Sequence, residues 1–366
     1  MIKYIDSTRM YEEVRHKLQP RSEEVYQSGM HFPDKYCGLA EDLLKEMSGR
    51  KYAWLVTSGT AGILAMFLAN KIQPGSTIAC TNYSCPATVM PINLIGAKPV
   101  FFDVNEYGQQ THDDRLNDCD YIMATGLYGD TYDHDEFVKY GKPIMNDSAQ
   151  SFGAKYKGIE SLALGEMSII SFSTNKNCPI YGTYGAVLTD DDELAERLRL
   201  IRRNGYENRD VALDIPIIGM NLQPHEDKAA QVLTSLEFLP DWQRRRAEIN
   251  DYLEDQCKKI GLSTRPTPDY STRNYHKFMI FVKNNRQFVD AMAGKGVNCQ
   301  LHYTYNFAKT TVFESKMNTE YPGTEWWRQH AVTIPSNPWL TTKELETIIQ
   351  TLKDTVTEED LGLCLT

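Results

Sequence analysis

Short runs of apolar and β-branched residues recur along the first half of the chain, and each is bounded by glycine, proline, asparagine or serine. Runs of this length and composition predict β-strands. We expect strands at residues 53–56, 77–81, 99–104, 121–125, 143–145, 168–172 and 185–189. Amphipathic segments between some of these runs predict helices at residues 63–69, 87–94, 133–139 and 191–203.

Strands that alternate with helices predict an α/β fold whose large, mostly parallel sheet is covered by helices on both faces. After a loop at 206–224, a long helix at 225–259 leads to a change of composition at 261–271. The later pattern predicts strands at 275–282 and 298–303 and helices at 286–293 and 342–355. We therefore expect an N-terminal helical arm, a large domain that includes the long connecting helix, and a smaller C-terminal α/β domain, at residues 1–30, 31–260 and 261–366.

Composition narrows the classes of partner. The 366 residues are 41% hydrophobic and 24% charged, which is typical of a folded globular protein. A net charge of −10 gives no general attraction to nucleic acid or to an anionic membrane. The eight cysteines are dispersed without a CxxC pair, so we expect no metal site. Dispersed thiols and a charged N-terminus without an apolar signal core predict a cytoplasmic protein.

One lysine lies in a polar turn between two predicted strands. Lys176 follows the run at 168–172 and precedes the run at 185–189. A lysine fixed between buried strands suits a Schiff-base role, because its amine must be partly desolvated to attack a carbonyl as the free base. The alternative interpretation is a solvated loop lysine.

A small-residue turn at 57–62 joins a predicted strand to a predicted helix. Backbone N–H groups at such a helix start can bind a phosphate. The alternative is an ordinary capped helix, with Ser58 or Thr60 as the cap.

A carboxylate stands at the end of another predicted strand. Asp147 follows the run at 143–145, and ligands of parallel sheets bind at the carboxyl ends of strands. Its alternative role is to cap the next turn. A phosphate-binding turn, a strand-end aspartate and a turn lysine, in that order, are together what a pyridoxal 5'-phosphate site requires, because the carboxylate keeps the pyridine nitrogen protonated.

Several motifs in sequence carry a family resemblance. They are VTSGTAG at 56–62, GAKPVFFDV at 96–104, NDSAQSFGAKYKG at 146–158, SFSTNK at 171–176, DDELAERLRLIRRNG at 191–205 and HY at 302–303. From about residue 29 to residue 352 the chain resembles the DegT/DnrJ/EryC1/StrS-type sugar aminotransferases, whose fold is pyridoxal-phosphate fold type I.

The resemblance implies roles for individual residues. It places Lys176 as the Schiff-base lysine, Asp147 at the pyridine nitrogen and Gln150 beside the ring hydroxyl. The same likeness assigns the phosphate to Gly59, Thr60 and Ser171. It also implies a homodimer with shared active sites, in which Asn221 reaches the phosphate of the neighbouring subunit.

The substrate side departs from the family pattern. Cys85 stands where many members have an aromatic residue that stacks on the cofactor, and we expect its sulfur to pack against the ring. Tyr184 lies in a Gly-Thr-Tyr-Gly stretch that replaces Gly-Glu-Gly-Gly, and Gln223 replaces an arginine. We expect His302, Tyr303 and Tyr184 to contact the substrate.

The resemblance implies an aminotransferase that moves an amino group from an amino acid such as glutamate to a nucleotide-linked keto-sugar by a ping-pong mechanism. Three alternatives stay open. One is an aminotransferase for another carbonyl compound, such as a cyclitol or a modified nucleotide. Another is a dehydratase or lyase, which Lys176 disfavours because family members that dehydrate have histidine there. The third is a non-catalytic binding protein on the same fold.

Overall fold

The computed structural model describes residues 1–207, 214–313 and 319–365, and a seven-stranded sheet lies at its centre. The strands follow the order β1 (Tyr52–Val56), β9 (Gly185–Thr189), β8 (Met167–Ser171), β5 (Ile144–Asp147), β4 (Tyr121–Thr125), β2 (Thr77–Thr81) and β3 (Lys98–Phe102). Strand β9 runs antiparallel to both of its neighbours, and the other adjacent pairs are parallel. The predicted mostly parallel sheet is confirmed, and one reversed strand is added.

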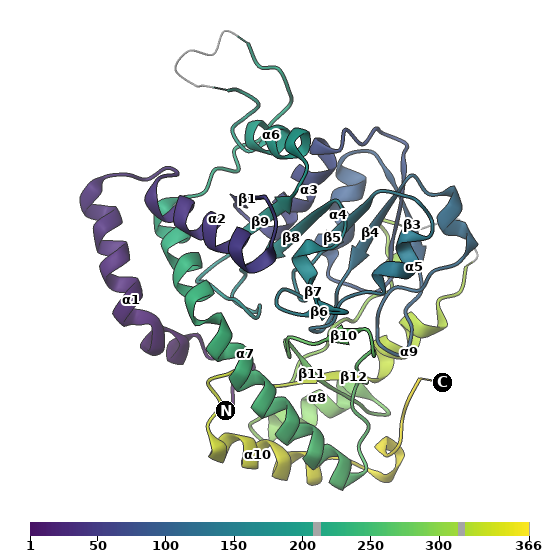
Figure 1. Ribbon diagram of the computed structural model, residues 1–366. Helices are drawn as coiled ribbons and strands as arrows, with labels where there is room; N and C mark the ends of the chain where they lie inside the picture. The colour runs from purple at the N-terminus through teal and green to yellow at the C-terminus, as the bar shows by residue number, and fades with distance from the viewer. Residues whose placement is uncertain (208–213, 314–318, 366) are drawn as a thin grey trace.

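Helices cover both faces of this sheet (Figure 1). One face packs against α2 (Lys35–Ser48), α5 (His134–Val138) and the first half of α7 (Glu226–Ile260). The other face packs against α3 (Gly59–Ala69), α4 (Pro86–Leu94) and α6 (Asp192–Ile201). Side chains alternate along a strand, so neighbouring residues of β8 enter opposite cores: Ile169 faces α3 and Ile170 faces α7.

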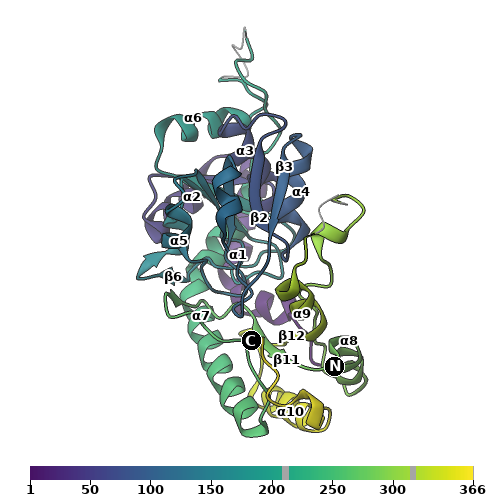
Figure 2. The same cartoon turned by 90° about the vertical axis from the view of Figure 1, so that its right-hand side faces the viewer.

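Helix α7 joins the sheet to a C-terminal unit (Figures 1 and 2). Beyond Pro240, which lies inside the helix, its residues Ile249 and Leu253 pack into a separate core of the C-terminal unit. That core is formed with β11 (Phe278–Phe281), α8 (Asn285–Gly294), β12 (Ala331–Ile334) and α10 (Thr342–Lys353). The predicted long helix is confirmed, while the three-part domain division stays a prediction.

The N-terminal helix α1 (Ser7–Ser28) packs along α7 and is also tied to the C-terminal unit. Arg9 forms an ion pair with Glu344 of α10, with 2.7 Å between the guanidinium and the carboxylate. Glu344 also completes the capping box of α10 with Thr341. Helix α1 confirms a helix within residues 1–30, and its assignment as a separate arm stays a prediction.

The C-terminal unit contains the main errors of the sequence interpretation. The predicted strand at 298–303 is wrong, because its only ladder contact is an isolated bridge between Gln300 and Thr333. The backbone carbonyl of His302 instead accepts hydrogen bonds from the hydroxyls of Tyr83 at 2.7 Å and Tyr128 at 2.8 Å. Strand β11 pairs with β12, which follows a helix, α9 (Pro322–His330), that the pattern did not predict.

Smaller features complete the fold. Strands β6 (Lys155–Tyr156), β7 (Ile159–Glu160) and β10 (Ser271–Thr272) form a separate three-stranded sheet. Part of the predicted loop at 206–224, residues 208–213, lies outside the described residues. No helix within the described ranges is both long and apolar enough to cross a membrane.

Candidate active site

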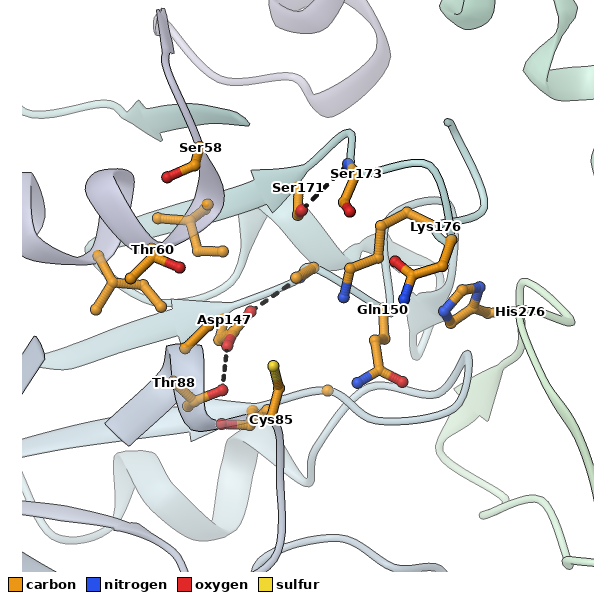
Figure 3. A pocket seen from close by; sticks show the side chains of 18 of the residues that line it. Ser58, Thr60, Cys85, Thr88, Asp147, Gln150, Ser171, Ser173, Lys176 and His276 are labelled. Atoms are coloured by element: carbon orange, nitrogen blue, oxygen red, sulfur yellow. Dashed lines mark hydrogen bonds between the residues drawn. The ribbon is translucent and has the colours of Figure 1, made fainter. Parts of the chain in front are cut away.

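A cavity of about 290 Å³ lies at the carboxyl ends of β4, β5 and β8 (Figure 3). Its sheet wall consists of the strand ends, the starts of α3 and α4, and the turn that carries Lys176. Its C-terminal wall consists of four residues that follow much later in the chain: His276, Lys277, His302 and Tyr303. The position agrees with the rule that open α/β sheets bind ligands at their strand ends.

Lys176 extends into the cavity from its turn (Figure 3). The turn is fixed by a backbone hydrogen bond from Lys176 to Ser173 at 2.9 Å and by one from Thr174 to Gly182 at 3.2 Å. The side chain is half-buried, and loss of water around the amine lowers the pKa of Lys176. A lowered pKa increases the fraction of free amine, so the environment is that of a nucleophile rather than of a solvated loop lysine.

Asp147 ends β5 and is buried at the base of the cavity. One carboxylate oxygen accepts a hydrogen bond from the Thr88 hydroxyl at 2.7 Å, and the other accepts one from the Ala149 N–H at 3.0 Å. The second bond is the capping role considered above, so Asp147 both caps its turn and faces the cavity. Burial raises the pKa of Asp147, and the bond from Thr88 acts in the opposite direction.

The start of α3 forms the opposite end of the sheet wall (Figure 3). Ser58 is the cap of this helix, since its hydroxyl accepts a hydrogen bond from the Ala61 N–H at 3.1 Å. The first intrahelical bond runs from Gly62 to Ser58, so the N–H groups of Gly59 and Thr60 have no partner within the helix and border the cavity. This is the arrangement that binds an anionic group.

Two glycines allow the chain to pass closely around this helix start. A Cβ atom on Gly59 would lie 3.1 Å from the Cβ of Ser171. A Cβ atom on Gly185, the first residue of β9, would lie 2.8 Å from the backbone nitrogen of Gly59. The cradle formed by Gly59, Thr60 and Ser171 therefore depends on the absence of side chains at both glycines.

The remaining cavity residues of the predicted set come together around Gln150. Its amide donates a hydrogen bond to the Tyr303 hydroxyl at 2.7 Å. His302 lies beside Tyr303 in the C-terminal wall, and its Nδ1 is 2.9 Å from the Thr333 hydroxyl. The structure thus places Gln150, His302 and Tyr303 in the same cavity as Lys176 and Asp147.

Cys85 lies in the cavity, and the neighbouring Tyr83 does not. The Cys85 sulfur points toward the interior of the cavity (Figure 3). Tyr83 is fully buried, and its hydroxyl donates to the His302 carbonyl and accepts from the Tyr303 N–H. The place of Cys85 in the cavity agrees with the expectation that its sulfur lies near the cofactor ring, and its packing against the ring stays a prediction.

The structure corrects the expectation for Tyr184. Thr183 lines the cavity, whereas Tyr184 is buried in the core between the sheet and α7. Its hydroxyl accepts a hydrogen bond from the backbone N–H of His225. Successive residues of an extended chain point in opposite directions, so Tyr184 has no path to a substrate in this cavity.

Asn221 and Gln223 lie outside the cavity of their own chain. Asn221 is exposed and forms an isolated bridge with Arg203. Gln223 borders a separate cavity with Arg202, Arg203 and Phe32. The role of Asn221 in a neighbouring subunit stays a prediction.

The sequence interpretation missed several cavity residues. These are Ser58, Thr88, Thr125, Ser173, Asn175, Thr183, His276 and Lys277. A signal for Lys277 was present, because the strand predicted at 275–282 contains this lysine, and a lysine is an unusual residue in a buried strand. Thr88 gave no such signal, since a threonine in the first turn of a helix is common.

Residues 13–353 match the DegT/DnrJ/EryC1/StrS aminotransferase family. The match covers nearly the whole chain, and the protein belongs to this family. Family membership agrees with the cavity, in which a partly desolvated lysine and a buried aspartate occupy the strand ends.

Curated relatives match over almost their full length. The chain is 26% identical over 361 residues to the UDP-2-acetamido-2-deoxy-3-oxo-D-glucuronate aminotransferase of Pseudomonas aeruginosa, covering 96% of this chain and 99% of the relative. It is 25% identical over 363 residues to the dTDP-3-amino-3,6-dideoxy-alpha-D-galactopyranose transaminase of Aneurinibacillus thermoaerophilus, covering 96% and 98% of the two chains.

Solved structures share the fold. A DegT DnrJ EryC1 StrS aminotransferase from Brucella abortus superimposes with a TM-score of 0.90 at 21% identity, covering 98% of this chain and all of that one. NtdA from Bacillus subtilis, solved with bound cofactor PMP, gives a TM-score of 0.84 at 20% identity and covers 96% and 83% of the two chains. The fold is therefore that of fold type I aminotransferases, as predicted.

Proposed function

We propose that this protein is a pyridoxal 5'-phosphate-dependent aminotransferase that moves an amino group from an amino acid, glutamate in the first instance, to a nucleotide-linked keto-sugar. The observation that carries the proposal is the meeting of three groups in one cavity: the Lys176 amine, the buried Asp147 carboxylate and the open N-terminus of α3. Each group matches one functional part of the cofactor, namely its aldehyde, its ring nitrogen and its phosphate.

The residues present fit this cofactor. Gly59, Thr60 and Ser171 would hold the phosphate, because a side chain at Gly59 would fill the space before Ser171. Gln150 and Cys85 would border the ring. When bound, the cofactor would supply a carbonyl for amine exchange and a ring that withdraws electrons from the substrate's Cα.

Two side chains would manage the protons. Lys176 would hold the cofactor through its Nζ. Once displaced by the donor amine, the lysine amine would take the proton from the substrate's Cα and deliver it to the cofactor carbon that carried the aldehyde. Asp147 would keep a proton on the ring nitrogen, and Thr88 would hold the carboxylate in its ionised form. The same groups serve both halves of a ping-pong reaction, since the keto-sugar reverses the steps of the donor.

The names of the relatives support the substrate class. The Pseudomonas enzyme is an aminotransferase of a UDP-linked keto-glucuronate, and the Aneurinibacillus enzyme is a transaminase of a dTDP-linked amino sugar. Both names describe a hexose derivative joined to a nucleotide. A substrate of that kind is therefore the first choice for this chain, ahead of a cyclitol or a free modified nucleotide.

The proposal includes a homodimer with shared sites. Asn221 lies on an exposed segment outside its own cavity, so a role at the cofactor phosphate requires a second subunit. The Asn221 amide of one subunit would donate a hydrogen bond to the phosphate held by the other.

The test converts the enzyme to its pyridoxamine phosphate form and mixes it with a panel of keto-sugar nucleotides. Return of the aldehyde absorbance identifies the substrate, and we expect it with at least one nucleotide-linked keto-hexose. A response to keto-cyclitols alone would replace the substrate class. Elimination of water without amino transfer would identify a dehydratase or lyase. A purified protein that binds no cofactor would contradict the proposal that this protein is a pyridoxal 5'-phosphate-dependent enzyme.

A further inference from the structure

The C-terminal wall of the cavity contains a buried lysine that the steps above do not use. Lys277 has only 6% of its surface exposed and immediately precedes β11. Its Nζ lies 3.1 Å from the Tyr4 hydroxyl and 3.2 Å from Nε2 of His302. An ammonium has three hydrogen-bond donors, so one donor of Lys277 remains after these two contacts.

This ammonium has no counter-ion in the described part of the chain. No carboxylate there lies within ion-pair distance of Lys277, and the acidic residue in the cavity lining, Asp147, is engaged with Thr88. Burial lowers the pKa of Lys277, and the nearby Lys176 lowers it further. Burial of an unpaired cation is unfavourable, and an anionic ligand would relieve it.

A second observation at the same wall points to a ligand. His276 is only 8% exposed, and its Nε2 has no hydrogen-bond partner in the described chain. The His276 ring borders the cavity next to Lys176 (Figure 3). A buried polar atom beside a cavity normally has a partner, which a ligand can provide.

We propose that Lys277 and His276 bind a carboxylate of the substrate, an inference that rests on the aminotransferase function proposed above. One remaining ammonium donor and one imidazole nitrogen suit a single monoanion. A nucleotide diphosphate carries more charge and is better matched by arginine forks or a helix N-terminus. The carboxylate has two possible sources: the amino-acid donor, or a keto-sugar that is itself a uronic acid.

The binding test uses glutarate, a dicarboxylate that has no amine to transfer. Calorimetric titration of the cofactor-loaded enzyme compares wild type with Lys277→Met and with Lys283→Met, which removes an exposed lysine just beyond β11. We expect Lys277→Met to weaken glutarate binding by about 100-fold, because hydrogen bonds between charged groups are strong and the loss of one partner of a buried charged pair is costly. Lys283→Met should bind as wild type does.

A second substitution guards against misfolding. Lys277→Gln keeps a hydrogen-bond donor for Tyr4 or His302 and should weaken glutarate binding by a smaller factor, about tenfold. Both variants should retain the visible absorbance of the bound cofactor and the melting temperature of wild type. Glutarate affinity within twofold of wild type in a folded Lys277 variant would overturn the proposal.

Single-turnover kinetics then separate the two sources. If the donor supplies the carboxylate, Lys277→Met slows the reaction of glutamate far more than that of its α-amide. If the sugar supplies it, the variant slows a UDP-linked 3-keto-glucuronate and spares the neutral 3-keto-glucose counterpart. If Lys277→Met slows the substrate with the carboxylate and its counterpart without it by the same factor, for both the donor and the sugar, the proposal is overturned. A wild-type enzyme that is inactive on every keto-sugar would contradict the proposed function. The glutarate titration would still test whether Lys277 and His276 bind a carboxylate.

Discussion

The two walls of the cavity are built in different ways. The sheet wall places Asp147 and Ser171 at the last residues of adjacent parallel strands, so hydrogen bonds along the whole sheet fix their positions. The C-terminal wall places His276 and His302 on irregular segments that are held by side-chain contacts. A site of this kind combines a wall that the sheet fixes rigidly with a second wall whose side chains can differ without disturbing the sheet. We therefore expect cofactor chemistry to depend on the first wall and substrate choice on the second.

The largest effect should follow removal of the amine from the sheet wall. Lys176→Ala should lower amino transfer by about 10⁴-fold or more, because the nucleophile and the proton carrier are lost together. Borohydride reduction of the wild-type enzyme followed by peptide mapping should place the cofactor on Lys176. A label on Lys277, which also lines the cavity, would show instead that the C-terminal wall carries the cofactor chemistry.

A loss of about 10³-fold should follow Asp147→Asn, because an amide cannot stabilise a protonated ring nitrogen electrostatically. Half-reaction kinetics with the amino donor measure this effect. The bound cofactor and the melting temperature should change little, since asparagine can still accept the Thr88 hydrogen bond. An unchanged rate would leave Asp147 with only its capping role.

Asn221→Asp should weaken cofactor binding by about 100-fold, because it would add a negative charge beside the phosphate. If Asn221 forms a third wall supplied by a second subunit, mixing this variant with Lys176→Ala should restore activity. One site of each mixed dimer then has an intact Lys176 and an intact Asn221, so activity should approach half that of wild type. If activity does not recover although subunit exchange is demonstrated, Asn221 does not contribute to the site of a second subunit.

A loss of about tenfold at neutral pH should follow Thr88→Val, because the variant removes a hydrogen bond to a charged group. The bond lowers the pKa of Asp147, so its loss should raise that pKa. Activity needs the ionised carboxylate, and the acid limb of the pH–rate profile should therefore move to higher pH. An acid limb that stays in place would separate Thr88 from the chemistry.

The smallest effect should concern stability alone. Glu344 pairs with Arg9 and caps α10, and these contacts lower its pKa from 4.5 to about 2. A lowered pKa gives stability that is present above pH 4.5 and is lost as the pH falls toward 2. Glu344→Gln should cost about 1 kcal/mol of unfolding free energy near neutral pH. The difference from wild type, measured by denaturant titration, should vanish toward pH 2.

The sequence predicted the sheet wall well, because its signals are local. Asp147 and Lys176 each follow an apolar run that ends in a polar turn, and this pattern appears within a few residues. The predicted bounds of β2, β4 and β9 agree with the structure at both ends. The reversed direction of β9 was not predictable from these runs, since an isolated strand gives no indication of its partner.

The C-terminal wall was less predictable because distant contacts form it. His276 and Lys277 follow Asn274, whose amide donates to the carbonyls of Gln150 and Phe152 more than a hundred residues earlier. These bonds hold residues 274–277 outside β11, whereas the sequence pattern predicted a strand that begins at residue 275. Tyr184 shows a different limit, because a one-residue step decides whether a side chain enters the cavity or the core.

The proline inside helix α7 determines where this helix bends most easily. The helix is a single rod of 35 residues, about 52 Å long at 1.5 Å per residue, with one half packed on the seven-stranded sheet and the other on the C-terminal unit. Proline has no N–H, so Pro240 leaves the carbonyl of Leu236 without its usual helical partner. The rod is therefore easiest to bend at Pro240, between its two halves. A small change of angle at this pivot would move α10 relative to the seven-stranded sheet. Lys277 would stay beside the cavity during that movement, because its N–H bonds to the Tyr128 carbonyl and Asn274 bonds to the carbonyls of Gln150 and Phe152.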